Sequence, residues 1–162
     1  VFLKEKNIRY DVIDACLLSK NNSNILHLFL KAEALSERLK LKTTENLVQS
    51  FKRVNNILKQ AEKLDGVIYE LEPDIEFFEG PEEHELFVGL NKVSDVVIAR
   101  LLKNDFVAAV ECLADLQNPI DNFFNAVKIN SDNPIVRRNR LCLLQKIRVI
   151  CNEVADFSLI EG

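Results

Sequence analysis

The chain has 162 residues, the size of one typical domain, and is long enough to bury an apolar core without a cofactor or a disulfide. Its apolar share of 48% and charged share of 28% are ordinary for a globular protein, while only four glycines and four prolines favour long helices over a turn-rich β fold. The net charge of -4 argues against binding nucleic acid through overall charge, but it leaves room for a local basic patch.

The cellular setting follows from what the sequence lacks. No apolar run approaches the ~18 residues of a membrane span and no leader opens the chain, so we expect a cytoplasmic protein. Four cysteines lie in apolar periodic segments without a C-x-x-C pair, which predicts reduced core residues: Cys16, Cys112, Cys142 and Cys151. The absence of methionine and the helix-like opening at Val1 predict a fragment of a larger protein.

Helical spacing of apolar residues runs through nearly the whole sequence, and no segment alternates as a half-buried strand does. We therefore predict an all-α bundle of about seven helices in a single domain, residues 1–162. The first two helices meet at Lys6-Asn7, and the second covers residues 10–18. Further helices are expected over residues 24–39, from Thr43-Thr44 onward, over 82–103 and 105–116, from Asn118-Pro119, and from 133 to 154 or 155.

The helix that begins near Thr43-Thr44 predicts a buried face and a basic face. Its apolar stripe consists of Leu47, Phe51, Val54, Leu58 and Ala61. On the other side, Lys52, Asn56, Lys59 and Lys63 repeat at the same steps, with Arg53 beside them. These five residues are called the basic ridge below. Lysine supplies point charges for a phosphate backbone and arginine a planar fork, so the ridge is a candidate RNA-binding surface.

The last long helix begins with Asn133 as N-cap and Pro134 at the first helical position. Its buried stripe is Val136, Arg140, Leu143, Ile147, Ile150 and Val154. Arg140 is therefore expected to pair with a carboxylate or to lie across apolar neighbours. The opposite, exposed side is predicted to carry Arg137, Arg138, Leu141, Gln145, Arg148 and Asn152, which makes it a second candidate RNA-binding surface.

Between these helices an acidic connector covers about residues 65–81. From 62 to 85 the acidic residues face a single basic one, Lys63, and the run is interpreted as a solvated surface. No catalytic, cofactor-binding or metal-binding residue is predicted, because the glycines are isolated and His27 and His84 have no second ligand at metal spacing. Phe123 and Phe124 could stack on unpaired bases, although core packing is favoured for both.

Five segments together resemble the C-terminal region of the β subunit of bacterial two-subunit glycyl-tRNA synthetase. They are residues 9–15 (RYDVIDA), 51–57 (FKRVNNI), 123–127 (FFNAV), 138–144 (RNRLCLL) and 154–159 (VADFSL). Each segment alone is weak, but their order and spacing match over nearly the whole chain.

The resemblance implies a helical anticodon-binding domain, similar to that of arginyl-tRNA synthetase, in a ligase that joins glycine to tRNA(Gly) using ATP. In that family the α subunit performs the chemistry, so the fragment itself would be non-catalytic. ATP and magnesium are implied for the holoenzyme only. Implied partners are tRNA(Gly), the α subunit and the remainder of the β subunit. The candidate tRNA contacts are then Lys52, Arg53, Asn56, Lys59, Lys63, Arg137, Arg138 and Arg148.

Two alternatives stay open at this point. The helices could form a scaffold or a subunit interface without direct RNA contact, with both basic faces merely solvated. An enzyme in its own right would require the fold to collect residues distant in sequence into one pocket.

Overall fold

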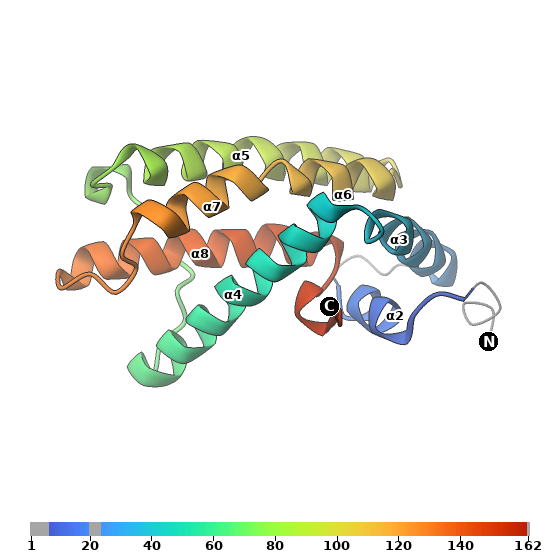
Figure 1. The fold of residues 1–162 in the computed structure, drawn as a ribbon, viewed down its shortest axis with the longest axis horizontal. Helices are drawn as coiled ribbons and strands as arrows, with labels where there is room; N and C mark the ends of the chain where they lie inside the picture. The colour runs from blue at the N-terminus through green and yellow to red at the C-terminus, as the bar shows by residue number, and fades with distance from the viewer. Residues whose placement is uncertain (1–6, 20–23, 162) are drawn as a thin grey trace.

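The computed structural model describes residues 7–19 and 24–161, and this part of the chain contains only helices and connecting turns (Figure 1). The helices are α2 (Tyr10–Leu17), α3 (Ile25–Arg38), α4 (Lys42–Asp65), α5 (Pro81–Leu102), α6 (Phe106–Ala114), α7 (Gln117–Ala126) and α8 (Pro134–Val154), with 3-10 turns η1 (Ile75–Phe77) and η2 (Phe157–Leu159). The predicted all-α fold is confirmed. The helix predicted before Lys6 lies outside the described residues.

The bundle is organised around α8, which contacts α4, α5 and α6. In Figure 1, α5, α7 and α8 run lengthwise while α4 crosses α8 diagonally. Helix α4 contacts α6 and α7 as well as α8, and the α2–α3 pair lies toward one end of the molecule. In the segment between α4 and α5, the 3-10 turn η1 contacts α8. The acidic connector therefore contacts α8.

Helix ends follow the capping chemistry of the sequence at some positions and not at others. The Asn133 side chain accepts hydrogen bonds from the amides of Ile135 at 3.0 Å and Val136 at 3.4 Å, as predicted for the start of α8. The start predicted for α4 at Thr43-Thr44 is slightly late. The helix already begins at Lys42, because the amide of Thr44 donates to the Leu41 carbonyl and places both threonines inside the first turn.

One cluster of apolar side chains forms the core of the described residues, and it contains the whole predicted stripe of α4 and the Leu143, Ile147, Ile150 and Val154 positions of the α8 stripe, while Val136 and Arg140 are buried outside it. Leu141 is a correction: it was placed on the exposed side of the last helix, yet it is 0% exposed, because α8 is covered on several sides at once. Cys16, Cys142 and Cys151 are buried as predicted, whereas Cys112 is only partly buried. Burial raises the pKa of the Cys16 and Cys151 thiols to about 12.

Phe51 is central to the contact between α4 and the C-terminal turn. Its ring is 1% exposed and meets the ring of Phe157 edge to face at 5.7 Å between centroids. We predict that Phe51→Ala lowers the free energy of unfolding by about 3–5 kcal/mol, because it leaves a cavity that the helices cannot close. Urea denaturation measures this. Leu64→Ala on the same helix, at an 81% exposed position, should change it by less than about 0.5 kcal/mol.

Within the described ranges, no helix is long and apolar enough to cross a membrane.

Candidate nucleic-acid interface

Two of the arginines predicted to project from α8 are instead held by carboxylates of α4. Arg137 Nη1 donates to Asp65 Oδ2 at 2.7 Å, and Arg148 Nη1 donates to Glu62 Oε2 at 3.2 Å. The exposed fractions of these arginine side chains are only 22% and 16%. Their predicted exposure is wrong, because α4 packs across α8 and its carboxylates cover both arginines. Both arginines join the two helices.

A third residue strengthens the contact between Arg137 and Asp65. The hydroxyl of Tyr69, a buried residue just beyond α4, donates to the same Asp65 carboxylate. This hydrogen bond and the Arg137 guanidinium hold the pKa of Asp65 below its ordinary value. The carboxylate therefore remains charged and paired throughout the neutral pH range. It is not an isolated negative charge that would repel a polyanion.

Arg140 was predicted to be structural, and its partners confirm that. It is 6% exposed, and its guanidinium donates to Glu83 at 2.8 Å, to Glu79 at 2.6 Å and to the Lys128 carbonyl at 2.9 Å. Burial opposes the charged form, but the hydrogen bonds to Glu83 and Glu79 outweigh it and hold the pKa of Arg140 above its ordinary value. Glu83 also accepts from the amides of Glu79 and Gly80, so the same carboxylate caps α5.

The acidic connector is attached to α8 along its length. Glu72 pairs with Lys146, and the side chain of Asn139 exchanges hydrogen bonds of 2.8 and 2.9 Å with the backbone of Asp74. The interpretation of the connector as a purely solvated acidic run is therefore incomplete. Much of its negative charge neutralises the basic residues of α8.

The basic ridge on α4 has a different environment. Arg53, Asn56, Lys59 and Lys63 are exposed and Lys52 is half-buried. Residues 46–61 contain no aspartate or glutamate at all. Toward the end of the helix, Glu62 and Asp65 are already paired with arginines of α8. A basic face without free carboxylates is the electrostatic surface that a phosphate backbone requires.

Arg53 lies over the ring of Phe124 in α7, with its guanidinium carbon 4.0 Å from the ring centroid. The sequence singled out both residues, but no spacing rule could bring them together because they belong to different helices. Arg138 on α8 is also exposed, and in the described part of the chain neither arginine has a carboxylate within ion-pair distance. Within the described residues, both arginines therefore keep their donors available.

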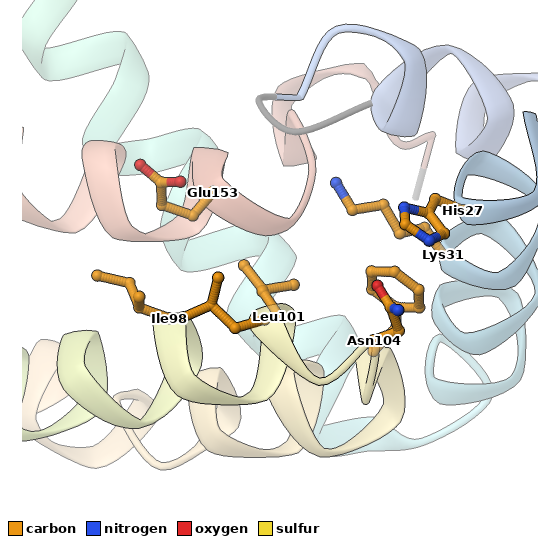
Figure 2. A pocket seen from close by; sticks show the side chains of 8 residues that line it. His27, Lys31, Ile98, Leu101, Asn104 and Glu153 are labelled. Atoms are coloured by element: carbon orange, nitrogen blue, oxygen red, sulfur yellow. The ribbon is translucent and has the colours of Figure 1, made fainter. Parts of the chain in front are cut away.

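A hollow of about 470 Å³ lies elsewhere, between α3, the α5–α6 junction and the end of α8 (Figure 2). Lys31 extends into it from α3 but is 2% exposed and donates to Ser19 at 2.9 Å, and burial lowers its pKa. The hollow gathers residues distant in sequence, as the enzyme alternative requires. Its lining has one carboxylate, Glu153, and no hydroxyl or thiol, so neither paired-carboxylate chemistry nor a hydroxyl or thiol nucleophile can be assembled.

No group of three or more His, Cys, Asp or Glu side chains is placed to hold a metal ion within residues 7–19 and 24–161.

The chain folds as a helical domain in which α4 presents a basic face, and most basic residues of the α8 helix packed against it are paired with carboxylates. Residues 47–157 match the model of the DALR anticodon binding domain, and the chain belongs to this family. It is 49% identical over 162 residues to the glycine–tRNA ligase beta subunit of Dinoroseobacter shibae and 48% identical to that of Ruegeria sp.. A more distant match is 37% identical over 163 residues to the beta subunit of Rhodospirillum centenum.

The chain spans 22–24% of the length of these three relatives, and the match covers all of this chain.

The ion pair between Arg148 and Glu62 leads to a prediction about stability, for which Arg138 on the same helix is the control. We expect Arg148→Ala to lower the free energy of unfolding by about 1–3 kcal/mol, because it removes charged hydrogen bonds in a partly buried contact and leaves Glu62 unpaired. The nearby Arg138→Ala, at an exposed position, should cost less than about 0.5 kcal/mol. Chemical denaturation of both variants compares them. Equal losses would contradict the division into a joining and an exposed arginine.

Proposed function

We propose that this chain is the anticodon-binding domain of a glycine–tRNA ligase beta subunit and that α4 holds the anticodon stem-loop of tRNA(Gly). The observation that carries the proposal is the carboxylate-free basic face of α4, in a chain whose net charge is -4. The family and the names of the relatives supply the kind of RNA. Phosphate contacts would give affinity, and a few side chains would read bases.

Within this proposal the eight candidate residues have two roles. The basic ridge and Arg138 are available for RNA contact, because they are unpaired in the described structure. Arg137 and Arg148 would position α4 by joining it to α8. The domain would carry no chemistry of its own. ATP and magnesium would act with the α subunit of a cytoplasmic holoenzyme, and this domain would supply tRNA recognition to it.

The lysines of the ridge provide the first test. We expect Lys59→Ala combined with Lys63→Ala to weaken tRNA(Gly) binding and to reduce the slope of log affinity against log salt by about 1–2, because each phosphate contact releases counterions. The exposed pair Lys92 and Lys103 on α5 and its C-cap is the matched control. Its double alanine variant removes the same charge and should leave the slope unchanged. Filter binding from 50 to 300 mM salt compares the two.

If both double variants change the slope equally, the interaction depends on overall charge and not on α4. If neither changes it and binding persists, the RNA contacts lie elsewhere in the subunit, and the alternative of a helical scaffold or subunit interface is favoured for this domain.

Recognition of the anticodon itself requires a second comparison. The holoenzyme should bind tRNA(Gly) more tightly than the same tRNA with an exchanged anticodon, by roughly tenfold or more per lost base contact. The Lys59/Lys63 double variant should weaken both tRNAs by similar factors, since phosphates carry no sequence information. Gel-shift titration measures all four affinities. Equal wild-type binding to both tRNAs would overturn the anticodon assignment and leave a general tRNA-binding role.

A further inference from the structure

The contact between Arg53 and Phe124 differs from those of the other arginines. Arg137, Arg140 and Arg148 are each fixed by carboxylates that occupy their donors. Arg53 is fixed by a ring, with the guanidinium carbon 4.0 Å above its centroid. A cation held over an aromatic face gains about 0.5–1 kcal/mol at an exposed site and keeps its N–H groups unoccupied. Arg53 is therefore held in place yet chemically available.

The ring beneath Arg53 is itself anchored. Phe124 meets the ring of Phe123 edge to face at 5.9 Å between centroids, and Phe123 is 0% exposed in the core. One turn before Arg53, the Gln117 side chain of α7 donates to Ser50 on α4 at 3.1 Å and to Asp121 at 2.7 Å. These hydrogen bonds fix the two helices next to the stacked pair and occupy the carboxylate of Asp121.

The exposed side chains at helical spacing from Arg53 on α4 are polar and uncharged, while Asp121, three residues before Phe124 on α7, accepts a hydrogen bond from Gln117. Gln49, Asn56 and Gln60 are exposed at helical spacing from Arg53 on α4, and Asn125 is exposed next to Phe124. Amides offer both donors and acceptors to base edges, and no acidic residue interrupts residues 46–61. Unpaired RNA bases stack on aromatic rings and on arginine planes, with their edges left for hydrogen bonds.

We infer that the Arg53 guanidinium, fixed on the Phe124 ring, is the platform on which one unpaired base of the anticodon loop stacks, with the neighbouring amides facing the edge of that base. The inference rests on the proposed function and adds to it a pair of residues that stacks on an unpaired base. One planar face of the guanidinium is occupied by the ring, and the exposed side chain leaves the other face open. The base completes a three-layer stack of ring, guanidinium and nucleobase.

The experiment uses the complete β subunit with its α subunit and anticodon stem-loops of tRNA(Gly). One stem-loop is intact, and each of the others lacks one base of the loop through a single abasic nucleotide. Arg53→Lys keeps the charge but removes the plane, and Phe124→Leu keeps an apolar side chain but removes the ring. Both variants should bind the intact stem-loop roughly tenfold more weakly, and Arg53→Lys should leave the salt slope unchanged.

The abasic series separates stacking from packing. At the loop position whose base stacks on Arg53, removing the base should lower the affinity of the wild-type protein about tenfold. The same removal should not lower the affinity of Arg53→Lys any further. At other loop positions, the loss of affinity caused by the abasic nucleotide and the loss caused by Arg53→Lys should add. Wild-type affinity in Arg53→Lys, or a loss that adds at every position, would overturn the platform. Thermal unfolding of Arg53→Lys, which changes an exposed side chain, should match that of the wild type and so excludes misfolding as the cause.

The outcome also distinguishes the inference from the function on which it rests. If the Lys59/Lys63 double variant weakens binding while Arg53→Lys and Phe124→Leu do not, the platform is wrong and RNA binding by α4 stands. If none of these variants changes affinity or salt slope, the proposed function is wrong together with the platform.

Discussion

The ion pairs between α8 and the acidic residues from the end of α4 to the start of α5 are the constraint on which the rest of the structure depends. Glu62 and Asp65 at the end of α4, Glu72 in the connector, and Glu79 with Glu83 at the start of α5 reach α8 from three directions. Since a buried ion pair gains little net free energy, we interpret the Arg140–Glu83 contact as fixing the register of α5 against α8. The apolar core supplies the stability.

This arrangement explains how an acidic chain can present a basic surface. The carboxylates that cancel charge are concentrated where they meet α8, and none occurs in residues 46–61 of α4. Most of the positive charge of α8 is therefore neutralised by ion pairs, while that of the basic ridge on α4 is not. Net charge is a poor guide to nucleic-acid binding for this reason, because a phosphate backbone interacts with the local potential within about a Debye length.

The candidate site was only partly predictable from the sequence. Helical spacing located the basic ridge on α4 and assigned Arg140 to the buried side of α8, because both follow from a period of 3.6 residues. The same period could not assign Arg137 and Arg148. Their partners lie 72 and 86 positions away, and the crossing of α4 over α8 is a property of the packed bundle. The prediction that Leu141 is exposed was wrong for the same reason, since a helical wheel assumes that a helix has only one buried face.

The sequence by itself determined the helical class, the approximate ends of the helices, the N-cap at Asn133 and the basic ridge, because all of these are local properties of composition and spacing. Tertiary structure alone decided which charges remain available. It paired Arg137 and Arg148 of α8 with distant carboxylates and brought Arg53 over Phe124, joining two of the segments that carry the family resemblance. Charge pairing and ring stacking act over a few ångströms, and only the folded chain sets those distances.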